Sequence, residues 1–195
     1  MRTFKEEELY VNDQQIIEMY WNRDEQAIRS TADKYGSYCY AIAFGILHNE
    51  EDSKESVNDT YMNAWNRMPP DRPAVLKNFL GRLTRWISVD RWRKKTAGKR
   101  GGGELPQVLE ELSECISKDG DPVGETEKKL LDETVGAFVK GLGDTEQRVF
   151  LSRYWYAESV KEIANRFCFS ESKVKSMLMR TRKKLHERLV KEGLL

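Results

Sequence analysis

Apolar residues recur at helical spacing along most of the chain, in runs separated by short polar or Gly/Pro-containing breaks. No run shows sustained alternation of apolar and polar residues, which is the pattern of a half-buried strand. The pattern therefore predicts an all-α fold. The expected helices are one capped by Asp13, one over about 24–48, one opened at Glu51 or Asp52, one over about 74–95, one over 127–142, and one capped by Asp144 or Thr145 that runs to about Tyr156.

Two kinds of break divide the chain. "MPPDRP" at Met68–Pro73 has three prolines in five residues, so no helix continues through it. Residues 101–124 mix Gly, Pro and acidic residues around one short apolar stretch. We expect two small helical domains, 13–97 and 127–192, joined by an acidic linker, 98–126, with room for a short helix.

The C-terminal stretch "SVKEIANRFCFSESKVKSMLMRTRKKLHERL" contains two amphipathic patterns on either side of Cys168-Phe169-Ser170. Ala164 is a small residue of the kind that a close helix crossing requires, and Ser170 is a candidate N-cap. Two helices joined by about three residues fit a helix-turn-helix, and cations lie mainly off the apolar stripe of the second helix. The alternative is an amphipathic hairpin with a solvated basic face. The predicted buried stripe is Val174, Met177, Leu178, Thr181 and Leu185.

A second basic segment, "FLGRLTRWISVDRWRKKTAGKR", interleaves Trp86 and Trp92 with Arg and Lys. Aromatic rings stack on unpaired bases while cations hold the phosphate backbone, so this helix is typical of a surface for single-stranded or melting DNA. In the alternative, both tryptophans belong to the core and the cations are solvated. Trp92 continues the apolar stripe from Phe79 and Leu83, which favours a core position for it.

Composition excludes several classes of protein. The net charge is only +1, but its distribution runs basic, acidic, basic along the chain, which indicates two cationic surfaces separated by an acidic connector. The three cysteines are widely spaced, so we expect no disulfide framework, no structural metal and no cofactor. No catalytic set is recognisable, so we do not expect an enzyme. The absence of a signal segment or a long apolar run predicts a reduced, soluble, cytoplasmic protein without membrane insertion.

The order of these parts resembles a bacterial RNA polymerase sigma factor of the extracytoplasmic-function (ECF) group. The segments that carry the resemblance are "EEDSKESVNDTYMNAWNRM", then "FLGRLTRWISVDRWRKK", then the acidic linker and the helix-turn-helix. The resemblance covers roughly Asp13 to Glu192. It implies two helical domains, regions two and four, that bind core RNA polymerase and direct promoter recognition, promoter opening and transcription initiation.

The resemblance also implies roles for the residues of region two. The helix that begins near Asp52 corresponds to the segment that grips core polymerase, and the "PPDRP" loop to the one that captures an extruded base. The polymerase contacts implied are Asp52, Glu55, Asn58, Asp59 and Met62. The contacts implied with melting minus-ten DNA are Arg72, Lys77, Asn78, Arg82, Arg85, Trp86, Arg91, Arg93, Lys94 and Lys95.

In region four, the resemblance implies that the second helix of the helix-turn-helix reads duplex DNA of the minus-thirty-five element. Three departures from the family pattern limit what can be transferred. The "PPDRP" loop is unusually proline-rich, so the identity of the base that it captures is not transferable. Trp86 stands where the family commonly has Asn, so a polar contact is either lost or replaced by stacking. The first turn "SESK" differs as well, so the promoter sequence is not transferable. The implied contacts are Ser172, Lys173, Lys175, Ser176, Met179, Arg180 and Arg182.

The implied partners are bacterial core RNA polymerase, promoter DNA in duplex and single-stranded form, and an anti-sigma protein. Two other functions remain open from the sequence. A helix-turn-helix transcription regulator would bind DNA without polymerase. A sigma-like protein with weak promoter melting would bind polymerase without opening DNA.

Overall fold

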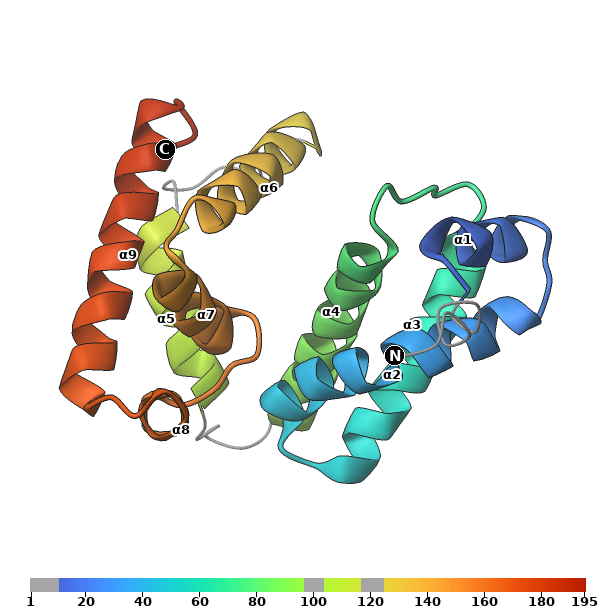
Figure 1. Ribbon diagram of the computed structural model, residues 1–195, viewed down its shortest axis with the longest axis horizontal. Helices are drawn as coiled ribbons and strands as arrows, with labels where there is room; N and C mark the ends of the chain where they lie inside the picture. Colours follow the sequence, from blue (N-terminus) through green and yellow to red (C-terminus); the bar gives the residue numbers. More distant parts are fainter. Residues whose placement is uncertain (1–10, 97–103, 117–124) are drawn as a thin grey trace, which may run out of the picture. The chain divides into compact units, whose positions relative to one another are not determined.

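The computed structural model describes residues 11–96, 104–116 and 125–195. All the regular elements in these ranges are helices, which confirms the all-α prediction (Figure 1). The chain divides into two compact units, Met1–Arg100 and Gly101–Leu195. Each unit has its own hydrophobic cluster and is described by itself.

The described residues of unit 1 form four helices, α1 (Asp13–Trp21), α2 (Gln26–Leu47), α3 (Glu50–Arg67) and α4 (Leu76–Thr96). Helices α2, α3 and α4 all contact one another, and α1 packs on α2. Each helix buries one apolar stripe in the common core, as amphipathic helices of a small bundle do. The core includes Ile16, Tyr20, Cys39, Leu76 and Leu80.

The helix starts differ from the sequence predictions by one or two residues because side-chain caps decide them. Asn12, not Asp13, caps α1, and it forms a capping box with Gln15. Asn49 caps α3 by accepting from the backbone N–H of Asp52, so α3 begins at Glu50. Asp13 instead accepts a hydrogen bond from the Tyr35 hydroxyl at 2.5 Å.

Unit 2 contains α5 (Glu104–Ile116), α6 (Glu125–Lys140), α7 (Asp144–Tyr154), α8 (Val160–Phe167) and α9 (Glu171–Lys191). The long helix α9 is the centre of this unit, since α5, α6, α7 and α8 all contact it. Gly143, not Asp144 or Thr145, occupies the N-cap of α7, and that helix ends at Tyr154.

Helix α5 corrects the linker prediction for residues 104–116. This segment is part of unit 2, because it packs on α7 and α9 and buries Leu105 and Val108. The short helix for which the sequence left room is α5; its apolar stripe includes positions 105, 108 and 112, and Leu112 joins the same cluster. Pro106 is tolerated because it lies in the first turn, where backbone N–H groups have no partner within the helix. Two other parts of the predicted linker, 98–103 and 117–124, lie outside the described residues, and residues 125–126 begin α6.

Helices that combine the length and the apolar character needed to cross a membrane are not found among the described residues.

Candidate nucleic-acid interface

Helices α8 and α9 form the predicted helix-turn-helix. Ser159 and Glu162 make a capping box at the start of α8, and Cys168 ends this helix in the left-handed conformation at φ 54°. Ser170 then accepts from the backbone N–H of Lys173 at 3.2 Å, so it caps α9 as the sequence predicted. Ala164 is buried where α8 meets α9.

The predicted stripe of α9 is confirmed, since Val174, Met177, Leu178, Thr181 and Leu185 are all buried. The opposite face of the first three turns is exposed and mixes hydroxyl, thioether and cationic groups. Such a face suits a major groove, where cations and hydroxyls meet base edges and phosphates. Its exposed residues are Glu171, which adds one carboxylate, and Ser172, Lys173, Lys175, Ser176, Met179 and Arg180.

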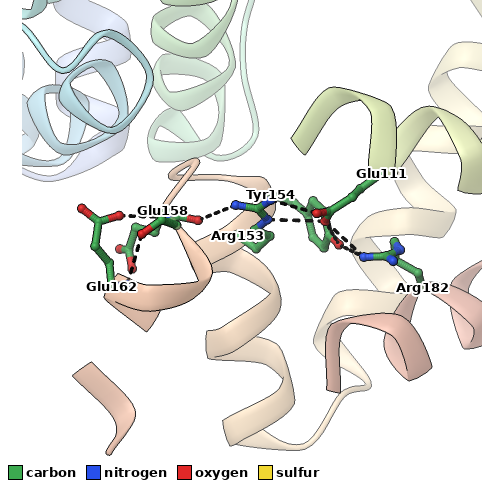
Figure 2. Close-up of polar contacts among 7 residues, drawn as sticks. Glu111, Arg153, Tyr154, Glu158, Glu162 and Arg182 are labelled. Atoms are coloured by element: carbon green, nitrogen blue, oxygen red, sulfur yellow. Dashed lines mark hydrogen bonds and ion pairs between the residues drawn. The ribbon is translucent and has the colours of Figure 1, made fainter. Parts of the chain in front are cut away.

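Arg182 does not belong to this exposed face. It lies four residues after Leu178 and three before Leu185, so it sits at the edge of the buried stripe. Its Nη1 donates to the Tyr154 hydroxyl at 2.6 Å and to Glu111 Oε2 at 3.1 Å (Figure 2). We therefore correct its assignment from DNA contact to internal ion pair.

The Glu111 carboxylate joins α5, α7 and α9 (Figure 2). Besides Arg182, it accepts from Arg153 Nη2 at 2.8 Å and from the Tyr154 hydroxyl at 2.8 Å. Arg153 is fully buried, and its Nη1 also donates to the backbone carbonyl of Glu158 at 3.0 Å. Burial favours the neutral acid, but the hydrogen bonds from Arg153 and Tyr154 and the two guanidinium charges outweigh it and lower the pKa of Glu111.

A cluster of cations and aromatic rings surrounds the turn of the helix-turn-helix. The rings of Phe167 and Phe169 stack with centroids 6.0 Å apart. Lys173 Nζ lies 3.5 Å from the Phe169 ring centroid, and the exposed Arg148 lies 5.2 Å from that of Phe167. Arg148 was not a sequence-predicted site residue. It comes from α7, and only the fold brings it next to the turn.

In unit 1, Trp86 is 64% exposed on α4, so the alternative of a core position is excluded for it. It borders a pocket of about 640 Å³ between the end of α3, the "PPDRP" loop and α4. Arg67, Arg72 and Arg82 also line this pocket. An exposed indole beside three guanidinium groups suits an unstacked base with its phosphates. Trp92 is half-buried.

The loop that carries Arg72 is fastened to α1. The Trp21 indole N–H donates to the Asp71 carbonyl at 3.2 Å, and the Arg72 guanidinium lies 5.2 Å from the Trp21 ring centroid. Arg72 also pairs with Glu18. These contacts hold the loop at one edge of the pocket.

Some of the residues predicted to contact polymerase form ion pairs with residues predicted to contact DNA. Arg91 pairs with Glu55 at 2.5 Å and with Asp59 at 2.6 Å, and Lys95 pairs with Asp52. The spacing of the three acids along α3 matches the i, i+4 spacing of the two cations on α4. These five residues form an ion-pair ladder between α3 and α4, which the separate sequence motifs did not reveal.

The remaining predicted residues of unit 1 lie on its surface. Asn58 and Met62 are exposed on α3, next to a groove of about 460 Å³ between α2 and α3 that Ile28 and Trp65 help to line. On α4, Lys94 pairs with Asp90 of the same helix. Exposed α4 residues from the predicted set are Lys77, Asn78, Arg82, Trp86, Arg93, Lys94 and Lys95, whereas Arg85 is half-buried.

One family model matches the chain, and it matches within unit 2. Residues 135–185 are similar to Sigma-70, region 4. The match covers about a quarter of the chain, from within α6 to within α9, and it includes α8, the turn and α9 as far as Leu185. It supports sigma-factor-like promoter recognition and polymerase binding by this part of the chain. No curated protein matches the sequence. Helix α5 and all of unit 1 lie outside the matched segment.

Proposed function

We propose that this protein is a bacterial sigma factor of the ECF group, which binds core RNA polymerase, recognises a promoter and stabilises its open form. The observation that carries the proposal is the similarity of residues 135–185 to Sigma-70, region 4, on a helix-turn-helix whose second helix presents an exposed polar and cationic face. No chemical catalysis forms part of this proposal.

In this function, α9 enters the major groove of the minus-thirty-five element. Its N-terminal half carries the exposed face, and the positive end of the helix dipole, at the Ser170 cap, favours a nearby phosphate. Arg148 and Lys173 flank the turn and contact phosphates. Arg182 is left out, because its guanidinium is held by Glu111 and Tyr154.

The pocket beside Trp86 is the proposed site for an unstacked base of the minus-ten element. Extruding a base costs a few kcal/mol of stacking free energy, and stacking on an aromatic side chain offsets about 1–3 kcal/mol of this. An indole that is 64% exposed is available for such stacking without rearrangement of the core. Stacking on Trp86 then takes the place of the polar contact that Asn makes in the family.

The groove between α2 and α3 is the proposed polymerase-docking surface. Met62 is 52% exposed at its edge, which gives an apolar anchor between the charged side chains of Glu25 and Arg29. Asn58 lies one turn away on the same helix. The ion-pair ladder engages three of the predicted polymerase contacts, Asp52, Glu55 and Asp59, in holding α4. We therefore propose that the polymerase contact lies around Met62 and Asn58. We also propose a cytoplasmic location and an anti-sigma partner.

The deciding experiment adds the purified protein to bacterial core RNA polymerase and maps promoter opening with permanganate. Opening that requires both components supports the proposal. DNA binding without polymerase association indicates a helix-turn-helix regulator instead, and polymerase association without opening indicates a sigma-like protein with weak melting.

A matched pair of variants tests the role of α9. Replacing both Lys175 and Arg180 with Ala should abolish promoter recognition while association with polymerase persists. Lys191→Ala removes an exposed cation from the C-terminal end of the same helix and should leave both unchanged. Equal loss in the two variants would mean that α9 contributes only general positive charge.

A further inference from the structure

One wall of the pocket beside Trp86 is made by a loop. Residues 71–73 of the "PPDRP" loop line this pocket together with side chains of α3 and α4. The chain is fixed on both sides of the loop, because Met68 and Leu76 are fully buried in the core of unit 1. Between these anchors, Arg72 is exposed. The width of the pocket therefore depends on the contacts that hold residues 71–73.

Two side chains of α1 hold this part of the loop. The Trp21 indole N–H donates to the backbone carbonyl of Asp71 at 3.2 Å, and the Arg72 guanidinium lies 5.2 Å from the Trp21 ring centroid. Glu18, one turn earlier in α1, forms an ion pair with Arg72. Trp21 is itself half-buried and packs against the hydrophobic cluster of unit 1, so its ring connects the loop to the core.

Asp71 is also held by the end of α3. Its backbone N–H donates to the Arg67 carbonyl at 2.8 Å, and its carboxylate accepts a hydrogen bond from Arg67 Nε at 2.9 Å. Contacts with two helices thus converge on one residue of the loop. Prolines at positions 69, 70 and 73 restrict the backbone on both sides of this residue, so a shift at Asp71 moves the neighbouring wall of the pocket with it.

Glu18 and Trp21 are placed to act on the pocket without touching its contents. Neither residue is among those that line the pocket. Glu18 matches the charge of Arg72, so this guanidinium forms part of a wall that is already neutralised. Displacement of a recognition group by about 1 Å changes binding strongly, because packing and hydrogen bonding act only at short range. Contacts that lie outside the pocket can therefore decide how well a base fits inside it.

We propose that Trp21 and Glu18 are positioning residues that set which base the pocket accepts. The inference rests on the proposed function, in which an unstacked base of the minus-ten element stacks on Trp86 in this pocket. While the loop is held, the space beside Trp86 has a fixed width, and a purine and a pyrimidine fit it differently because a purine has a second ring. When the loop is released, the pocket adapts to either kind of base and discriminates less between them.

The first test measures base preference with the full chain bound to core RNA polymerase. A promoter library with randomised minus-ten and minus-thirty-five elements is transcribed, and a barcode in each RNA identifies its promoter by sequencing. Trp21→Leu removes both contacts of the indole with the loop. We expect it to reduce purine–pyrimidine discrimination at one minus-ten position by about five-fold and to leave the other positions unchanged. Trp86→Ala should relax the same position, because it removes another side of the same site.

Two further variants calibrate this result. Glu18→Gln removes the charge that pairs with Arg72 but keeps the Trp21 contacts, so it should relax the same position less than Trp21→Leu does. Asn22→Ala is the matched control, since Asn22 is exposed, follows Trp21 directly and does not line the pocket. It should leave the preference at every position unchanged.

The second test uses the free, isotope-labelled chain and involves neither polymerase nor DNA. In Trp21→Leu, the NMR resonances of the Asp71 and Arg72 amides should shift, and the Asp71 amide should exchange faster with solvent. The amide of Ala43, which is buried in α2, is the internal control and should not change. Trp21→Phe keeps an aromatic ring beside Arg72 but lacks the indole N–H, so its effect should lie between those of Trp21→Leu and the unchanged chain.

Four results would overturn the inference and leave the proposed function standing. The first is an unchanged base preference in Trp21→Leu. The second is a uniform fall in transcription from all promoters, because α1 would then only stabilise unit 1. The third is relaxation at a position that Trp86→Ala does not affect, and the fourth is a free chain whose loop amides do not respond. Failure of the unchanged chain to open any promoter refutes the proposed function instead, and this inference falls with it.

Discussion

The Glu111 ion-pair network predicts an asymmetry between two substitutions that each remove one of its charges. Glu111→Gln removes a carboxylate that Arg153 and Arg182 share. Arg153→Met removes the buried cation but leaves Glu111 with Arg182 and the Tyr154 hydroxyl. We therefore expect Glu111→Gln to destabilise unit 2 more than Arg153→Met.

The magnitudes follow from burial. Arg153 is 0% exposed and the Glu111 side chain 17%, so the pair belongs to the class in which loss of one partner costs about 3–5 kcal/mol. The amide of Gln still accepts one hydrogen bond, which places Glu111→Gln near the lower end of that range. Met fills most of the volume of the Arg153 stem, and Glu111 keeps its hydrogen bonds with Arg182 and the Tyr154 hydroxyl, so no charge is left unpaired and we expect about 1–2 kcal/mol for Arg153→Met.

Hydrogen exchange with mass spectrometry is the appropriate assay, because it reports on each unit separately and does not assume that the whole chain unfolds in one step. Exchange should rise in peptides from α7 and α9 and stay unchanged in α2 and α3 of unit 1, which serve as the internal control. The reasoning is refuted if Arg153→Met destabilises unit 2 more than Glu111→Gln. Equal effects would mean that packing of the side-chain stems, and not charge, holds α5.

Three further predictions concern other parts of the molecule. Lowering the pH should destabilise unit 2, because the pKa of Glu111 in the folded protein is below its ordinary value of 4.5. The stabilisation that ionised Glu111 provides is therefore complete above pH 4.5 and is lost as the pH falls through the folded pKa. A thermal-melt series from pH 6 to 3 should therefore show a steeper loss for the unchanged chain than for Glu111→Gln. Trp86→Ala should reduce promoter opening about ten-fold, and Trp86→Phe should retain most of it, because one base–aromatic stack is lost in the first variant and kept in the second. Permanganate reactivity measures opening in both variants, and equal loss in the two would argue against stacking. Arg91→Ala should destabilise unit 1 by about 1–2 kcal/mol, as measured by hydrogen exchange in α3 and α4. The Arg91 side chain is only 19% exposed, but the exposure of both carboxylate partners keeps the loss small. No change in that exchange would show that the ion-pair ladder contributes nothing to the fold.

Local sequence patterns determined most of the helices and the helix-turn-helix of this protein. The apolar period, the prolines after Met68 and the cap at Ser170 act over a few residues, so the chain itself records them. For the same reason the exposed face of α9 from Ser172 to Arg180 could be predicted, because its buried stripe has an unambiguous period. Helix boundaries were less certain by one or two residues, since neighbouring Asn, Asp and Gly residues compete for the cap.

Only the tertiary structure decided which charges are available for partners. Arg182, Arg91 and Lys95 have the composition of DNA-binding residues, but each is paired with an acid far away in the sequence. Glu111 is 71 residues from Arg182, and no local pattern encodes that pairing. The same limit explains α5: an acidic, Pro-containing segment is typical of a linker until α7 and α9 provide the surface that buries Leu105 and Val108 and partly buries Leu112. Pairing and burial depend on contacts between distant segments, and these exist only once the chain has folded.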